Sequence, residues 1–190
     1  TRPEDLVRLV DESVPMLQYV SRVEPYAPLP EPNGKPLQGL YDKAVVDYMD
    51  RAAELADEVI GAAQEVHGQA KVAGMVELGH GYRIVVTSRG AELAEELTWL
   101  RAYARALVDD ASGHWAFTST RLERDELRKV GSTAAEYALK ATRQVSVEPG
   151  EYTAILSPLV VGNLLGDLAW MASALSVLLG LSVFARYGVG

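Results

Sequence analysis

Hydrophobic residues recur at helical spacing in three stretches of this chain. The first, TRPEDLVRLVDESVPMLQYV at residues 1–20, predicts a helix with Thr1 as its N-cap and a break at Pro15. In the second, from Asp42 to Val66, apolar residues return every three or four positions, which predicts a long amphipathic helix with an acidic outer face. The third, at residues 123–144, keeps the same period and predicts another helix.

The pattern changes after residue 70, where short segments rich in β-branched residues predict strands. KVAGMVEL and YRIVVT are separated by GHG at residues 79–81, which favours a hairpin there, and SRG at 88–90 predicts a further turn. Residues 91–110 fit a helix by leucine spacing and propensity, but alternation from Thr98 to Val108 also allows a strand with a small-residue face. HWAFTSTRL, at residues 114–122, predicts a strand.

The last part of the chain is unusually apolar. VEPGEYTAILSP, at residues 147–158, predicts a turn and a short strand that ends at Pro158. A helix follows from about Leu159, and Asp167 is the only charged residue from there to Ala185. Polar and small residues interrupt this run, and an aspartate at the centre of a bilayer is costly, so we interpret the segment as a buried helix rather than a membrane span.

Together these elements predict an α+β fold, an antiparallel β-sheet with long helices packed on it. Residues 24–42 hold five of the nine prolines and predict an irregular connector. We therefore expect residues 1–40 to form a helix and a proline-rich connector, and residues 41–190 to form the α+β domain. The ends at Thr1 and Gly190 are typical of a piece cut from a longer protein.

Composition narrows the classes of partner and compartment. The 190 residues carry a formal net charge of −8, which argues against a nucleic-acid binder that depends on phosphate contacts. The chain has no cysteine, so disulfides and thiolate metal sites are excluded, and a reducing, cytoplasmic location is expected. There is no signal-peptide pattern.

The residues by themselves predict no catalytic, cofactor-binding or metal-binding site. His67, His80 and His114 do not have the spacing of metal ligands on one helix, and nucleophile-elbow and phosphate-loop motifs are absent. Two alternatives stay open: a hydrolase in which the fold brings Asp167 and His114 together, and a non-enzymatic module whose sheet edge takes up an extended peptide.

Four segments in order resemble the TldD/PmbA family. They are YRIVVTSRGAELAEELTWLRAYARAL, VGSTAAEYALKA, VEPGEYTAILSPLVVGNLLGDLAWMASA and GLSVF. The resemblance runs from about Tyr41 to Gly190 and corresponds to the N-terminal part of the family, without its β-rich C-terminal half. It also implies that Ala91 to Asp109 form a strand, which we adopt over the helix.

The resemblance carries an expectation about zinc. TldD-type members are metallopeptidases with an HExxxH helix, and its three functional positions fall here on Gly166, Asp167 and Met171. The chain is similar to the zinc-free PmbA/TldE branch, labelled "modulator of DNA gyrase" and linked to peptide maturation. The resemblance implies a non-catalytic partner of a TldD-type chain, or a homo-oligomer, acting on unfolded or extended peptides. Zinc is expected only in the TldD-type partner, and neither nucleic acid nor membrane is expected as a partner.

Overall fold

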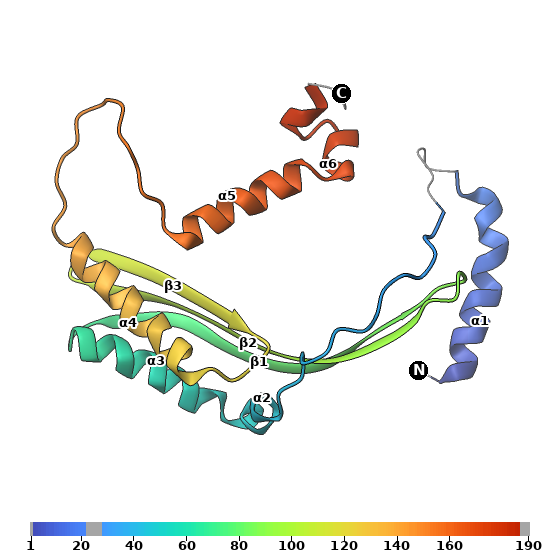
Figure 1. Cartoon of the computed structure of the whole chain (residues 1–190), viewed down its shortest axis with the longest axis horizontal. Helices are drawn as coiled ribbons and strands as arrows, with labels where there is room; N and C mark the ends of the chain where they lie inside the picture. Colours follow the sequence, from blue (N-terminus) through green and yellow to red (C-terminus); the bar gives the residue numbers. More distant parts are fainter. Residues whose placement is uncertain (1, 22–27, 187–190) are drawn as a thin grey trace. The chain divides into compact units, whose positions relative to one another are not determined.

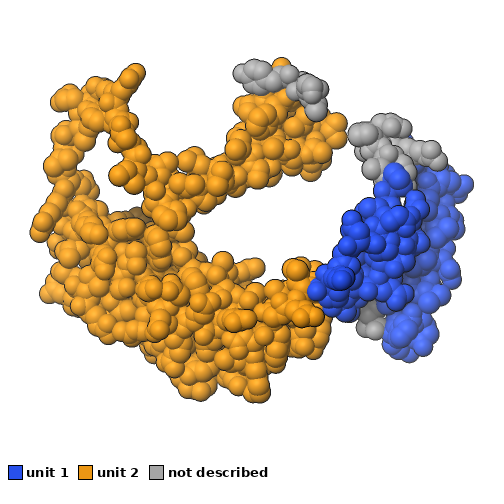
Figure 2. Space-filling view, in the orientation of Figure 1, with its two compact units in different colours: residues 1–36, 84–94 blue, residues 37–83, 95–190 orange. Residues whose placement is uncertain are grey.

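The computed structural model describes residues 2–21 and 28–186, and it divides the chain into two compact units. One unit contains residues 1–36 and 84–94, and the other contains residues 37–83 and 95–190 (Figure 2). The two units are described separately below. The expected boundary near residue 41 stays a prediction.

The smaller unit holds the first helix and the end of a β-hairpin. Helix α1 spans Pro3–Ser13, and the chain tightens into the 3-10 helix η1, Val14–Tyr19, so the expected break at Pro15 is confirmed. Arg2 occupies the N-cap position, whereas the expected cap Thr1 lies outside the described residues. The hairpin turns at Ser88–Gly90 as expected, with Gly90 at a φ of 86°, a conformation that glycine adopts without steric cost.

The larger unit is an α+β structure, which confirms the predicted fold class. It begins with α2 (Lys43–Asp47), the 3-10 helix η2 (Met49–Arg51) and α3 (Ala52–Val66). Three strands follow, β1 (Lys71–Val86), β2 (Glu92–Val108) and β3 (Ala111–Ser119), in the antiparallel order β1-β2-β3. The chain ends with α4 (Arg124–Ala141), α5 (Pro158–Met171), α6 (Ala174–Leu178) and η3 (Val183–Arg186). Helices α3 and α4 lie side by side on one face of the sheet (Figure 1).

Burial alternates along β2 and settles the ambiguous segment as a strand. Every second residue from Thr98 to Val108 is buried, and the residues between them are half-buried or exposed. The register pairs Leu100 with Ser119 and Val108 with Ala111. Three of the buried positions are alanines, so the covering helices approach the strand closely.

Two glycines set the distances between α3 and α4 and between α4 and the sheet. A Cβ atom on Gly131 of α4 would lie 1.9 Å from the carbonyl oxygen of Val59 on α3. A Cβ atom on Gly113 of β3 would lie 2.1 Å from the carbonyl oxygen of Ala134 on α4. These contacts are with backbone atoms, so the layers pack at this distance only because both positions lack a side chain.

The hairpin predicted at residues 79–81 is wrong. Lys71 to Val86 form one continuous strand, and the indole ring of Trp99 on β2 lies over Gly79, where a Cβ atom would come within 2.0 Å of the ring. The glycine therefore makes room for a cross-strand aromatic ring and does not turn the chain.

Three further expectations need correction. The helix expected from Asp42 to Val66 is interrupted by a 3-10 turn at Met49–Arg51. Residues 147–157 contain no strand, since they pair with no neighbouring strand in the described chain. Helix α5 is not buried: none of its residues is buried, and Leu164, Leu165 and Trp170 are each more than half exposed.

The exposure of α5 has a physical reason within the described chain. The helix is apolar on most sides and therefore needs neighbours all round, but the described elements cover little of it: Leu159 at its start lines a hollow on the sheet, and none of its residues is buried. No described helix combines the length and the apolar character that crossing a bilayer requires.

Candidate functional site

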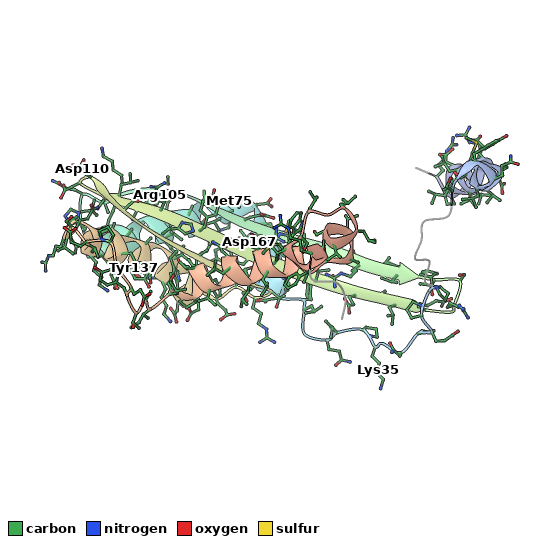
Figure 3. The ribbon with its side chains drawn as sticks, turned by 90° about the horizontal axis from the view of Figure 1, so that it is seen from above. Lys35, Met75, Arg105, Asp110, Tyr137 and Asp167 are labelled. Atoms are coloured by element: carbon green, nitrogen blue, oxygen red, sulfur yellow. The ribbon has the colours of Figure 1, made fainter. Side chains whose placement is uncertain are left out.

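The positions that the family resemblance assigns to the zinc motif lie on α5. Ser157 caps this helix by accepting a hydrogen bond from the backbone N–H of Val160 at 3.5 Å. Around Gly166 a Cβ atom would meet no atom within 4 Å, and the carboxylate of Asp167 is exposed (Figure 3). Gly166 supplies no donor atom and Met171 only a thioether, so this set of residues does not fit zinc.

The three histidines lie apart and have different surroundings. His67 follows the end of α3, and its Nδ1 atom is buried without a hydrogen-bond partner. His114 lies on β3 beside Tyr103, with ring centroids 6.1 Å apart. Across residues 2–21 and 28–186, no three histidine, aspartate or glutamate side chains gather closely enough to hold a metal ion.

The hydrolase alternative lacks its central contact. Among the hydrogen bonds and ion pairs of the described residues, none joins Asp167 to His114. The two residues lie on α5 and β3 respectively. The described structure therefore gives this pair no support as an acid–base unit.

His80 forms the most developed polar cluster, on β1 and β2. Its Nε2 atom lies 2.8 Å from Oε1 of Glu96, and the hydroxyl of Tyr82 donates to the same oxygen at 3.1 Å. The ring of Tyr41 meets His80 edge-on at 5.6 Å. The hydrogen bond to Glu96, and then the charge of that carboxylate, raise the pKa of Tyr82. His80 is therefore a locally hydrogen-bonded histidine.

A second polar group fixes the entry of the chain into the larger unit. The carboxylate of Asp42 accepts hydrogen bonds from the backbone N–H groups of Ala44 and Leu122, both at 2.9 Å. Its own backbone N–H donates to the hydroxyl of Thr98, which is fully buried and donates to the carbonyl oxygen of Thr120 at 2.7 Å. These contacts are structural: they join the connector, β2 and the loop before α4.

The face of the sheet opposite α3 and α4 carries a group of exposed and half-buried functional side chains. We define this open sheet face as the side chains that alternate with the buried ones on the three strands: Lys71, Met75, Glu77, Trp99, Arg101, Tyr103, Arg105, His114 and Thr118. Met75 and Arg105 project from neighbouring strands (Figure 3). Sequence reasoning did not single out this face, although the alternation from Thr98 to Val108 contained it.

Contacts on the open sheet face order its central side chains. The indole N–H of Trp99 donates to Oε1 of Glu77 at 2.8 Å, and the guanidinium of Arg101 lies 3.8 Å from the same oxygen. Arg105 donates to the hydroxyl of Ser112 at 3.0 Å. A shallow hollow of about 420 Å³ lies beside Tyr103. Its lining is largely apolar and includes Met75, Arg101, Tyr103, Ala116, Thr118 and Leu159.

Comparison with known proteins identifies the family. Residues 42–142 match the family model described as the PmbA/TldA metallopeptidase central domain. The chain therefore belongs to the PmbA/TldD metallopeptidase family. The matched model is that of the central domain and covers residues 42–142, whereas the sequence motifs indicated the N-terminal part of the family.

A solved structure has the same fold. The chain superposes on the crystal structure of TldE from Thermococcus kodakarensis with a TM-score of 0.58 and 18% sequence identity. The match covers 73% of this chain and 33% of that chain, so this chain spans about a third of the TldE structure. No curated protein matches.

The family match does not include the positions of the zinc motif. It ends at residue 142 and does not reach α5. The equivalence of Gly166, Asp167 and Met171 with zinc-helix positions therefore stays a prediction from the sequence motifs.

Proposed function

We propose that this chain is part of a TldE-like, non-catalytic partner in a zinc-dependent peptidase complex that acts on unfolded or extended peptides. The observation that carries the proposal is the donor set on α5. In a chain that belongs to a metallopeptidase family, the three expected motif positions hold Gly166, Asp167 and Met171. Without imidazole ligands the chain lacks the means to hold a catalytic zinc ion and activate its water there.

The exposed surface of α5 supports an assembly. Its leucine and tryptophan side chains form apolar surface that isolated folded proteins normally cover. We propose that the remainder of a longer chain or a TldD-type partner covers it. A homo-oligomer is the alternative arrangement, and a cytoplasmic location belongs to the same proposal because the chain has no cysteine.

Reconstitution of peptide cleavage tests the proposal. This chain, a TldD-type chain and a mixture of the two are each assayed. The substrate is one protein, tested in its unfolded and in its folded form. We expect cleavage of the unfolded substrate by the mixture and none by this chain alone. As a control, the histidines of the TldD-type HExxxH motif are replaced, which should abolish activity of the mixture. Cleavage by this chain alone, purified free of other peptidases, would contradict the proposal.

A second candidate is a peptide-binding module without any role in catalysis. It is favoured by one observation, the position of β1 at the edge of the sheet, where an extended peptide can add as a further strand. This candidate predicts peptide binding that a TldD-type chain neither strengthens nor turns into cleavage. Pull-down on an immobilised extended peptide, with and without that chain, separates the two candidates.

A further inference from the structure

The open sheet face differs in charge from the rest of the molecule. Among its defined side chains are three basic ones, Lys71, Arg101 and Arg105, and one carboxylate, Glu77. The whole chain has a net charge of −8. A local excess of positive charge on an acidic protein favours a negatively charged partner at that face.

The spacing of the cations along β2 is regular. Arg101, Tyr103 and Arg105 alternate with buried alanines, so their side chains leave the same face of one strand. At about 3.3 Å per residue, the two arginines are separated by roughly 13 Å along the strand. A second extended chain has the same repeat, so residues four apart on one of its faces have the same separation.

Apolar and aromatic surface lies between the two charges. Tyr103 is 44% exposed, and the hollow beside it is lined by Met75, Arg101 and Ala116 and by Leu159 at the start of α5. Ala116, the register partner of Tyr103, has only a methyl side chain and so leaves space beside the tyrosine ring. One aliphatic side chain of a ligand can pack there while its charged neighbours lie to either side.

We propose that the open sheet face binds extended peptides with two acidic residues four positions apart and an aliphatic residue midway between them. The acidic side chains pair with Arg101 and Arg105, and the aliphatic side chain occupies the hollow beside Tyr103. The inference names a substrate class for the proposed function and rests on its assumption that this chain handles extended peptides. It assigns the contact to the sheet face and not to its edge.

Direct binding tests the proposal without a TldD-type chain. A fluorescently labelled heptapeptide of threonines with glutamates at its second and sixth positions and leucine at its fourth is titrated with the full chain, and anisotropy is recorded. The control peptide has the same composition with the two glutamates adjacent. We expect the spaced peptide to bind about tenfold more tightly, and its affinity to fall as NaCl is raised from about 50 to about 500 mM.

Variants locate the contact. Arg105→Glu and Arg101→Glu are each expected to lower the affinity for the spaced peptide at least fivefold. Arg105→Lys is expected to retain most of the affinity. The matched control is Arg143→Glu, which makes the same charge change in the exposed segment that follows α4. Circular dichroism and melting temperature show that each variant is folded.

Four outcomes overturn the inference. Three of them are no detectable binding at millimolar peptide, equal affinities for the two peptides, and an equal loss of affinity with Arg143→Glu. Preference for a single-stranded oligonucleotide over the spaced peptide also overturns it, and assigns the basic and aromatic face to nucleic acid. If the peptide binds but no complex forms with a TldD-type chain, the proposed function fails and the peptide specificity stands. If the complex cleaves peptides but the spaced peptide does not bind to this chain, the proposed function stands and the peptide specificity fails.

Discussion

Replacing Gly131 by alanine adds a methyl group at the contact between α3 and α4. The new Cβ atom would lie 1.9 Å from the carbonyl oxygen and 2.8 Å from the carbonyl carbon of Val59, and 3.2 Å from the backbone nitrogen of Ala63. Ordinary contacts begin at 3.4 Å, so the two helices have to separate by about 1.5 Å at this point.

The stability cost follows from two opposed effects. Forcing a methyl group into a packed interface typically costs 1–3 kcal/mol, and contacts with rigid backbone place this site at the upper end of that range, about 3 kcal/mol. Alanine is favoured over glycine inside a helix by about 1 kcal/mol. We therefore expect Gly131→Ala to lower the free energy of unfolding by about 2 kcal/mol.

A second glycine provides a control of opposite sign. Gly61 lies within α3, and a Cβ atom there would meet no atom within 4 Å, so Gly61→Ala is expected to raise stability by about 0.5–1 kcal/mol. Urea unfolding followed by circular dichroism measures both values. Equal or greater stability of Gly131→Ala than of the wild type would refute the close approach of α3 and α4.

The polar group at Asp42 and Thr98 gives two further predictions. The backbone N–H of Leu122, and then that of Ala44, lower the pKa of Asp42 from 3.8, so its carboxylate stabilises the fold at neutral pH and loses this effect as pH falls through the lowered pKa. Asp42→Asn should therefore cost about 1 kcal/mol at pH 7 and progressively less as pH falls below about 4 in urea titrations; a cost that stays constant as the pH falls would contradict the assignment. Thr98→Val leaves the half-buried backbone N–H of Asp42 and carbonyl oxygen of Thr120 without their hydrogen-bond partner and should cost about 1–3 kcal/mol by the same measurement, whereas Thr118→Val on the exposed face should cost little.

Local sequence patterns were enough to predict most of the helices and strands. The helical period of residues 123–144 and the turn residues Ser88–Gly90 depend on neighbours in sequence, and both predictions were confirmed. The period of residues 91–110 did not distinguish a helix from a strand, because alanine and leucine fit either one. The family resemblance correctly favoured the strand.

The errors arose where distant residues decide the structure. The sequence around Gly79 is typical of a turn. The structure shows instead that the glycine lies under the ring of Trp99, which is twenty positions later in the chain. An apolar helix such as α5 indicates that something covers it, but its sequence does not say what. The pairing of His80 with Glu96, and the common face of Arg101 and His114, both depend on strand register, which the sequence patterns left undetermined.

The central claim is that this chain is the non-catalytic partner in a zinc peptidase complex. Measuring zinc content tests this claim most directly. The longest natural form of the protein is purified alone and after co-expression with a TldD-type chain, dialysed, and analysed for metal per polypeptide. The account predicts no zinc in the lone protein and about one zinc ion per TldD-type chain in the complex. Stoichiometric zinc in the lone protein would contradict it, because ligands other than Gly166 and Met171 would then have to hold the ion.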